Sequence, residues 1–329
     1  MIGHSVPMRR LMNLIDRTAS TNLPAIITGE TGTGKEVTAR EIHTRSARKG
    51  PFVPVNCAAI AESLFESELF GHEKGSFTGA DRRRLGHIER ANCGTLFLDE
   101  ITEMRSDAQA KLLRVIEEKT VLPVGGTEEI QVDVRFLAAS NRPPERAIIE
   151  GRLREDLYYR LNRLSIELSP LRERIDDLPL LIDYFIAQAN RDHNRRVEGV
   201  DDKCRRALQN YRWPGNIRQL HNVIETAVLL APSNQISLNE LPEEIRKYAN
   251  GEGHFTVFLG SPLEEVEREL IRRTIAFADG NKARASEILG VPRRTLYVKL
   301  ERYDAPHKSN GRANGNGRRA PGDGRNSLK

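Results

Sequence analysis

The sequence has few cysteines and no long apolar run. Its three cysteines, Cys57, Cys93 and Cys204, are far apart and form no CxxC pair. This spacing argues against a zinc site or a disulfide framework and predicts small buried core residues in a reducing compartment. No apolar run approaches the roughly 20 residues that span a bilayer, and no hydrophobic segment follows the N-terminal charges. We therefore expect no membrane helix, no signal peptide, no membrane partner and a cytoplasmic protein.

Charge is distributed unevenly along the chain. Residues 305–329 contain six Lys or Arg and one acid, so this segment alone has the net charge of +5 that the whole chain has. It is rich in Gly, Asn and Arg and nearly lacks large apolar residues. Burial therefore cannot offset its ordering entropy, and we predict a disordered basic tail. Such a tail either adds non-specific attraction to DNA or is a solvated terminus without a role.

The first half of the chain alternates apolar runs with helical patterns. Four runs indicate buried strands, at residues 24–28, 52–55, 95–98 and 135–140. The segments between them have room for crossover helices, so the order predicts a parallel α/β sheet with helices on both faces.

From about Ser169 the strand signals stop. Three helices are predicted next, at residues 176–192, 201–211 and 215–231. The first has an apolar stripe of Leu180, Leu181, Tyr184 and Phe185. Residues 232–261 contain recurring Pro, Gly, Ser and Asn, a composition typical of a linker.

The segment GETGTGKE, residues 29–36, lies where the first predicted strand passes into a helix. Its three glycines let successive backbone N–H groups turn inward around a polyphosphate, and the following helix offers its positive end. Lys35 can reach the β and γ phosphates, so the segment is predicted to be a nucleotide-binding P-loop. Glu36 stands where Ser or Thr usually binds magnesium, so that ligand must come from elsewhere or through water.

Polar side chains end two later strands. In GTLFLDE, Asp99 can hold Mg²⁺ directly or through water, and Glu100 can polarise the attacking water. Asn141 follows RFLAAS, where it can orient water or contact the γ phosphate, or form an Asx turn before two prolines. These carboxylates and the P-loop are expected at the same edge of the sheet.

Three arginines are candidates for nucleotide contacts. Arg154 and Arg160 lie near the expected edge of the core, where one subunit could insert them into its neighbour's site, or they form ordinary surface ion pairs. WPGNIRQL begins a helix and offers Arg218 to the phosphates. The predicted ATP-binding residues are Gly29, Glu30, Thr31, Gly32, Thr33, Gly34, Lys35, Glu36 and Arg218.

The segment GSFTGA, residues 75–80, has neither a helix nor a strand period. Small residues surround Phe77, so the loop is flexible and can press one aromatic ring against a partner. Alternatively, Phe77 folds back onto its own domain. The predicted contact residues are Gly75, Ser76, Phe77, Thr78, Gly79 and Ala80.

The last patterned segment indicates a helix-turn-helix. Residues 262–278 form an amphipathic helix opened by Ser261 and Pro262. A short helix, a turn at Gly290 and a second helix entered at Pro292 follow, with six basic and two acidic side chains between residues 280 and 303. The inward positions are Ala285, Leu289, Val291, Leu296 and Leu300. The predicted DNA contacts are Arg293, Arg294, Thr295, Tyr297 and Lys299. A hairpin used only for dimerisation is the other interpretation.

Together these motifs resemble the AAA+ domain and Fis-type DNA-binding domain of bacterial enhancer-binding proteins, the sigma-54-dependent transcription activators of the NtrC type. GETGTGKE and GTLFLDE are similar to the family's Walker A and Walker B sequences. ELFGHEKGSFTGA is similar to its sigma-54-contacting insertion, with Ser76 in place of the usual alanine. The resemblance implies that Asn56 is a switch residue paired with Glu100. It also implies arginine fingers at Arg154 and Arg160, sensor one at Asn141 and sensor two at Arg218.

The resemblance implies five regions over the chain. They are an α/β P-loop AAA+ ATPase subdomain (1–168), a helical lid (169–238), a linker (239–261), a three-helix Fis-type helix-turn-helix domain (262–304) and a disordered basic tail (305–329). Met1 lies near the AAA+ boundary, so we expect no N-terminal regulatory domain. Either a separate regulatory protein restrains the ATPase, or the chain is a fragment of a longer one.

The function implied is an ATP-driven transcription activator that uses ATP and Mg²⁺. Its partners would be sigma-54 RNA polymerase, upstream enhancer DNA and further copies of itself, from a dimer to a hexamer. Hydrolysis would remodel the polymerase from the closed to the open promoter complex. The alternatives are a nucleotide-binding, DNA-bound regulator that does not activate sigma-54, and an AAA+ unfoldase or DNA-remodelling motor.

Overall fold

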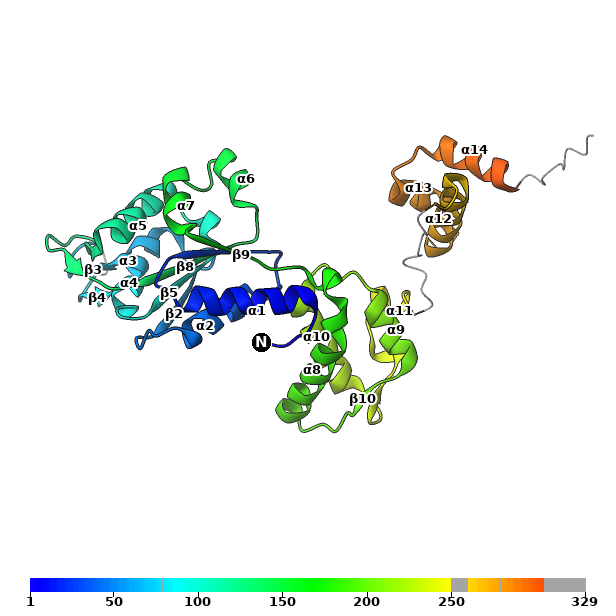
Figure 1. The fold of residues 1–329 in the computed structure, drawn as a ribbon, viewed down its shortest axis with the longest axis horizontal. Coiled ribbons are helices and arrows are strands. Elements are labelled where there is room, and N and C mark those ends of the chain that lie inside the picture. Colours follow the sequence, from blue (N-terminus) through cyan, green and yellow to red (C-terminus); the bar gives the residue numbers. More distant parts are fainter. Residues whose placement is uncertain (78–79, 250–259, 279, 305–329) are drawn as a thin grey trace, which may run out of the picture. The chain divides into compact units, whose positions relative to one another are not determined.

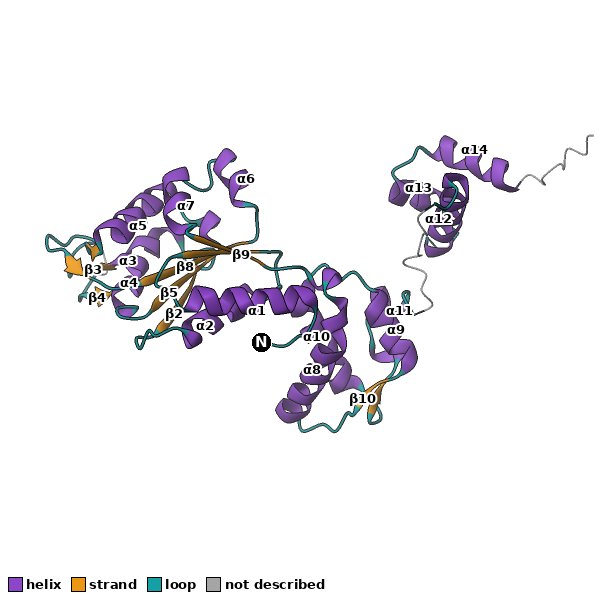
Figure 2. Ribbon diagram, viewed as in Figure 1, coloured by secondary structure: helices purple, strands orange, loops and turns teal. Residues whose placement is uncertain are grey.

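The structure is a computed structural model that describes residues 1–77, 80–249, 260–278 and 280–304. The chain divides into two compact units, residues 1–251 and residues 252–329. Figure 1 traces both units in chain order, and Figure 2 shows that strands are concentrated in the first. The predicted tail at residues 305–329 lies outside the described residues.

A five-stranded parallel sheet forms the centre of the first unit. Its strands, in spatial order, are β2 (Phe52–Asn56), β5 (Thr95–Asp99), β8 (Arg135–Ser140), β1 (Ala25–Thr28) and β9 (Leu164–Glu167). The four predicted strands and their parallel order are confirmed. The edge strand β9 was missed, because only Leu164 and Ile166 are apolar in its four residues.

Alternate residues of β1, β5 and β8 enter two separate cores, as a parallel sheet buried on both faces requires. Ala25, Ile27 and their neighbours pack on α1 (Val6–Ala19) and α2 (Lys35–Arg45). Ile26 and its neighbours pack on the opposite layer of helices, visible in Figure 1. That layer consists of α3 (Phe65–Phe70), α4 (His87–Arg90), α5 (Ser106–Glu118) and α7 (Glu155–Leu161), while α6 (Pro144–Ile149) follows β8.

A helical lid follows the sheet. It contains α8 (Leu178–His193), α9 (Asp202–Asn210), α10 (Asn216–Leu230), α11 (Glu243–Arg246) and the short parallel pair β10 (Gly199–Val200) and β11 (Gln235–Ile236). The three long helices lie where the sequence predicts them. The stripe predicted on α8 was partly wrong: Leu181 and Phe185 are buried, but Leu180 and Tyr184 are 41% and 45% exposed. The helix instead buries the face that runs from Leu178 through Leu181, Ile182 and Ile186 to Ala189.

The predicted linker was wrong in its first half. Leu241 and Ile245 are 1% and 0% exposed and belong to the apolar core of the lid, together with Ile236 and Ala249. Pro, Ser and Asn do form turns here, but apolar residues between the turns return the chain to α9. Residues 250–259 of the predicted linker lie outside the described residues.

The second unit contains three helices in its described residues. They are α12 (Leu263–Phe277), α13 (Lys282–Leu289) and α14 (Arg293–Asp304). The Asn281 side chain caps α13 by accepting from two backbone N–H groups, and Gly290 ends that helix with φ of 64°. Ala285 and Leu296 are fully buried, and Leu289, Val291 and Leu300 pack around them, so the predicted inward positions are confirmed.

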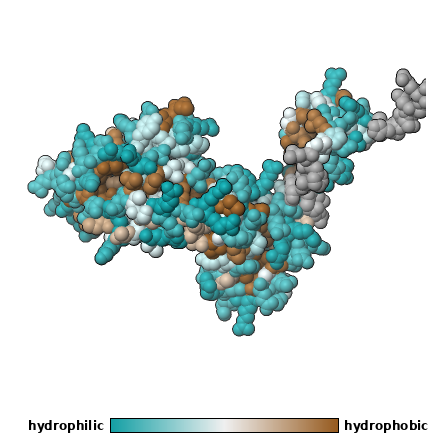
Figure 3. All heavy atoms as spheres, in the orientation of Figure 1, coloured by the Kyte–Doolittle hydropathy of each residue, from teal (hydrophilic) through white to brown (hydrophobic). Residues whose placement is uncertain are grey.

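Two of the three cysteines are buried. Cys57 and Cys204 are buried as predicted, but Cys93 is exposed, because it lies in the turn that enters β5, with φ of 59°. Figure 3 shows a largely hydrophilic surface with apolar patches on the visible face. No helix within the described ranges is long and apolar enough to cross a membrane.

Candidate functional site

The predicted P-loop connects β1 to the start of α2. Gly32 and Gly34 have φ of 79° and 102°, in the left-handed region that glycine adopts without strain. A Cβ atom on Gly32 would also lie 2.3 Å from the carbonyl oxygen of Gly215 in the lid, so only glycine fits there. The loop therefore meets both the sheet and the lid.

Lys35, the first residue of α2, turns back over the loop. Its Nζ atom donates to the carbonyl oxygens of Gly29 and Glu30 at 2.9 and 3.4 Å. The residue is 7% exposed. Burial lowers the pKa of its ammonium group, and the carboxylates of Glu100 and Asp99 oppose that shift. The ammonium thus lies in a partly dehydrated place that favours an anionic ligand.

A cavity of about 290 Å³ opens beside Lys35. Residues from the P-loop, β2, β5 and the lid line it, namely Thr31, Gly32, Gly34, Lys35, Glu36, Val37, Asn56, Asp99, Glu100, Ile217 and Arg218. The structure therefore brings most of the predicted nucleotide residues to one place. Apart from the two finger arginines, four predicted residues are not among those that line it, namely Gly29, Glu30, Thr33 and Asn141. Gly29, Glu30 and Asn141 line a separate cavity of about 370 Å³, and the Glu30 carboxylate binds Arg172 and Asn216.

The two carboxylates after β5 have different surroundings. Glu100 has φ of 56°, which directs it away from the strand, and its N–H donates to Asp99 Oδ1 at 3.2 Å. Its Oε2 atom accepts from the backbone N–H of Asn141 at 3.3 Å. Burial raises the pKa of the Glu100 carboxyl, and Lys35 opposes that shift. Glu100 is thus placed as a proton acceptor beside the cavity.

The expected pairing of Asn56 with Glu100 is not among the hydrogen bonds of the described residues. Asn56 Oδ1 instead accepts from the N–H of Ala58 at 2.9 Å, which closes a turn after β2. Asn56 still lines the cavity. In this structure Glu100 is therefore connected to the β8 end, at Asn141, rather than to β2.

The donor set at the cavity fits a nucleotide-borne magnesium ion. Within the described part of the chain, no group of three or more His, Cys, Asp or Glu side chains could hold a metal ion. Mg²⁺ usually binds one or two carboxylates and takes its other ligands from water and substrate phosphates. Asp99 and Glu100 on the cavity wall meet that requirement.

The predicted finger arginines lie outside this cavity. Arg154 forms two hydrogen bonds to Asp156, at 3.0 and 2.6 Å, and Arg160 lies 3.8 Å from Glu117. Both side chains are more than 40% exposed. One chain therefore does not bring them to its own nucleotide cavity, whereas Arg218 already lines it.

The described part of the GSFTGA segment, residues 75–77 and Ala80, lies between two paired short strands, β3 (Gly71–His72) and β4 (Arg84–Leu85). The Gly75 N–H donates to the Ala80 carbonyl at 2.8 Å, and the Ala80 N–H to the Phe77 carbonyl at 3.0 Å. Ser76 Oγ donates to the Glu73 carbonyl at 2.9 Å, so the serine hydroxyl strengthens the turn. Thr78 and Gly79 lie outside the described residues.

Phe77 combines the two predicted alternatives. Its ring is 39% exposed, yet its other side meets the buried His72 ring edge-on, with centroids 5.0 Å apart. The aromatic tip therefore rests on its own domain while part of the ring faces solvent.

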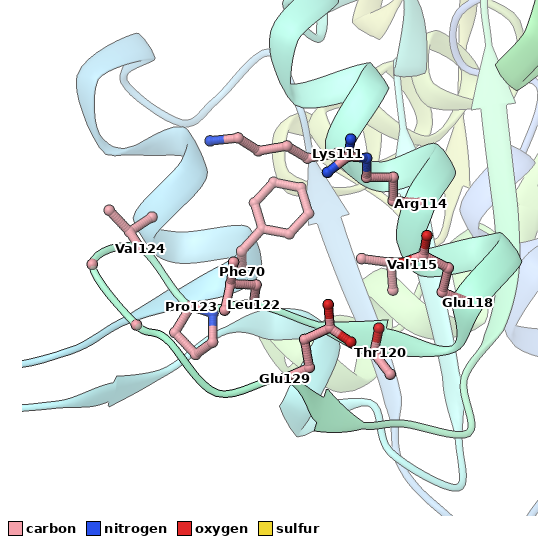
Figure 4. Close-up of a pocket in the computed structure, with 12 residues that line it drawn as sticks. Phe70, Lys111, Arg114, Val115, Glu118, Thr120, Leu122, Pro123, Val124 and Glu129 are labelled. Carbon is pink, nitrogen blue, oxygen red and sulfur yellow. The ribbon is translucent and has the colours of Figure 1, made fainter.

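A neighbouring hairpin was missed by sequence reasoning. It is formed by β6 (Thr120–Val121) and β7 (Ile130–Gln131), and Val124 within it exchanges backbone hydrogen bonds with Gly71 and Glu73. A cavity of about 290 Å³ lies between this hairpin and α5, as Figure 4 shows. The Gly125–Gly126 pair between two β-branched runs was the available signal.

The second unit exposes four of its five predicted DNA-contact residues. Arg293, Arg294, Thr295 and Tyr297 are exposed on α14. Lys299 differs, because its Nζ atom binds Glu267 of α12 at 2.5 Å. Lys299 is therefore paired with α12 in this structure, and its role as a DNA contact stays a prediction.

Comparison with known proteins assigns the chain to a family. Residues 1–167 match the Sigma-54 interaction domain, residues 172–256 the AAA+ ATPase lid domain and residues 262–303 the Fis family of bacterial regulatory proteins. The chain belongs to the sigma-54-dependent transcription activators. It is an AAA+ ATPase with a sigma-54 interaction domain, and it binds DNA through a Fis-type helix-turn-helix.

Similar proteins cover nearly all of this sigma-54-dependent activator. The transcriptional regulatory protein ZraR of Klebsiella oxytoca is 45% identical over 303 residues, which are 92% of this chain and 68% of that protein. The regulatory protein AtoC of Escherichia coli K12 is 44% identical over 292 residues, 87% of this chain and 63% of that protein. NtrX from Brucella abortus, solved in complex with ATP, is 34% identical, has a TM-score of 0.71 and covers 92% of this chain and 69% of that one. The predicted fold and function are confirmed, against the alternative of a regulator that does not activate sigma-54.

Proposed function

We propose that the cavity beside Lys35 hydrolyses ATP with the residues that the sequence predicts. The single observation that carries this proposal is the convergence of Lys35, Asp99, Glu100 and Arg218 on one cavity wall. Phosphate oxygens replace the carbonyl groups of Gly29 and Glu30 as acceptors for Lys35 Nζ. Arg218 adds a second cation from the lid.

Glu100 holds and polarises the attacking water. Its Oε2 atom is fixed by the Asn141 N–H, so the other carboxylate oxygen is left to accept from water. Asp99 provides the carboxylate for Mg²⁺, which when bound neutralises charge on the β and γ phosphates. Asn141, which follows β8, holds Glu100 through its backbone N–H, and its side chain is proposed to orient this water.

A second copy of the chain completes the site. Phosphoryl transfer is stabilised by cations near the γ phosphate, and Arg154 and Arg160 are exposed outside the chain's own cavity. In a ring, proposed to be a hexamer, these side chains exchange their Asp156 and Glu117 partners for the neighbour's nucleotide. The sites therefore form between subunits.

Hydrolysis moves the Phe77 loop against sigma-54 and converts the closed promoter complex into the open one. Phe77 rests on its own domain through the His72 ring contact, so a change in the core that breaks this contact releases the ring toward sigma-54. The helix-turn-helix domain, proposed at residues 262–304, holds the assembly at upstream DNA through Arg293, Arg294, Thr295 and Tyr297.

Mixing two inactive variants tests the shared site. Lys35→Ala removes the phosphate ligand and Arg160→Ala removes the finger, so each alone should lose ATP hydrolysis by about 100-fold or more. In mixed assemblies, the Arg160→Ala chain still has Lys35 in its cavity, and a neighbouring Lys35→Ala chain can supply Arg160 to that cavity. ATP hydrolysis should therefore return in part. Arg163→Ala, an exposed arginine beyond α7, is the control and should keep the parental rate. Mixtures as inactive as their components would contradict a site formed between subunits.

A further inference from the structure

Three residues tie the P-loop to the lid, and we call them the P-loop clamp: Glu30, Arg172 and Asn216. The guanidinium of Arg172 donates to both oxygens of Glu30, at 2.8 and 2.6 Å. Asn216 Nδ2 donates to Glu30 Oε2 at 3.1 Å. These bonds, first that from Arg172 and then that from Asn216, lower the pKa of Glu30 to about 2. The carboxylate is therefore held in its charged form between two lid residues.

Asn216 is the buried centre of the clamp. It is the first residue of α10 and is 0% exposed, with φ of 50°. Its Oδ1 atom accepts from the Leu171 N–H at 2.8 Å, and its Nδ2 atom also donates to the Thr31 carbonyl at 3.1 Å. One side chain thus joins α10, the segment that holds Arg172, and two groups of the P-loop.

The same end of α10 reaches the P-loop through its backbone. The N–H groups of Ile217 and Arg218 donate to the Gly32 carbonyl at 3.0 and 3.3 Å. The Arg218 side chain, next to Asn216, lines the nucleotide cavity, whereas none of the three clamp side chains does. The shape of the P-loop and the position of Arg218 therefore depend on the same contacts between the P-loop and the start of α10, and the clamp side chains form theirs outside the nucleotide cavity.

We propose that the P-loop clamp is a positioning unit that holds the P-loop in its nucleotide-binding shape and keeps Arg218 over the cavity. The proposal rests on the nucleotide site described above and adds residues that do not touch the nucleotide. Because the clamp acts on the shape of the binding loop, it stabilises bound substrate and transition state alike. Losing it raises the KM for ATP and leaves kcat nearly unchanged.

Steady-state ATP hydrolysis by the full chain tests the clamp. Glu30→Gln and Arg172→Gln should each raise the KM for ATP about fivefold to tenfold, with kcat changed by less than about twofold. The double variant Glu30→Gln/Arg172→Gln should have a KM for ATP no higher than that of the single variant with the higher KM, because the two side chains act as one unit. Arg172→Lys, which keeps the charge but not the two-pronged geometry, should lie between parent and Arg172→Gln.

Asp16→Asn provides a matched control. Asp16 pairs with Arg45 at 2.6 Å, an exposed ion pair that joins α1 to α2 away from the P-loop. The Asp16→Asn variant should leave both the KM for ATP and kcat unchanged. Thermal unfolding of every variant checks that the chain folds.

Three results overturn the clamp, and a fourth outcome shows instead that the nucleotide site is wrong. Clamp variants that lower kcat at a parental KM would show a loss of folded or catalytic protein rather than of positioning. Single effects that multiply in the double variant would show that Glu30 and Arg172 act independently. If the parent hydrolyses no ATP, or Lys35→Ala hydrolyses it at the parental rate, the nucleotide site is wrong. If ATP hydrolysis depends on Lys35 but the clamp variants keep the same KM and kcat as Asp16→Asn, only the clamp is refuted.

Discussion

Asn216 joins the lid to the P-loop through three side-chain hydrogen bonds. Replacing it by glycine removes the side-chain bonds to Leu171, Thr31 and Glu30 while keeping a backbone that tolerates φ of 50°. Leu171 is 0% exposed, so its N–H is left without an acceptor, at a cost of about 1–3 kcal/mol. We expect Asn216→Gly to lower the free energy of unfolding of the lid by about 2 kcal/mol.

Alanine at the same position separates the backbone from the side chain. The left-handed conformation costs a Cβ-bearing residue about 1–2 kcal/mol, partly offset because glycine loses more backbone freedom on folding. Asn216→Ala should therefore be less stable than Asn216→Gly by about 1 kcal/mol.

Urea unfolding followed by tryptophan fluorescence measures both values. Trp213 is the only tryptophan in the sequence and is fully buried in the lid, and its carbonyl accepts from the Asn216 N–H at 2.8 Å. It therefore reports unfolding of the lid directly. Variants within about 0.5 kcal/mol of the parent, or an alanine variant more stable than the glycine variant, would refute this reasoning.

Three further predictions concern the lid, the cysteines and the clamp. In urea titrations, Ile245→Ala should lower the free energy of unfolding of the lid by about 2–5 kcal/mol, because Ile245 is buried. The control Glu243→Ala changes an exposed residue and should lower it by less than about 0.5 kcal/mol. Equal effects of the two variants would show that the segment is a linker after all. Thiol labelling at pH 8, read by mass spectrometry, should modify Cys93 first, because burial raises the pKa of Cys57 and Cys204 to about 12; equal labelling rates would contradict this. The pKa of Glu30 is about 2 in the folded chain against an ordinary 4.5, so its stabilisation is complete above pH 4.5 and is lost as the pH falls toward 2. The stability difference between parent and Glu30→Gln should shrink over that range, and a growing difference would be inconsistent with the clamp.

Strong local patterns explain why much of the fold was predictable. The strands that precede the P-loop, Asp99 and Asn141 are continuous apolar runs, and such runs in a parallel sheet are buried on both faces. Edge strand β9 has apolar residues at only two of four positions, so its identity depends on pairing with β1 rather than on its own sequence. The segment around Ile245 was misassigned because turn residues dominate its composition, while its burial comes from tertiary packing with α9.

The site residues that belong to known sequence motifs could be predicted from the sequence. Lys35, Asp99 and Glu100 belong to motifs whose spacing already implies their convergence. The clamp has no such motif, because Arg172 lies 142 residues from Glu30 in the chain, and Asn216 lies 186 residues away. The Lys299–Glu267 ion pair has no motif either, because its partners lie on different helices, 32 residues apart in the chain.

In the proposed function, ATP hydrolysis drives the Phe77 loop against sigma-54. The most direct measurement is open-complex formation by sigma-54 RNA polymerase, with ATP hydrolysis followed in the same reaction. Phe77→Ala should hydrolyse ATP at the parental rate and form no open complex. The control Leu23→Ala removes a 43% exposed apolar side chain just before β1, and it should both hydrolyse ATP and form open complexes at the parental level. Open complexes formed by Phe77→Ala at the parental level would contradict the claim that this loop transmits the energy of ATP hydrolysis to sigma-54.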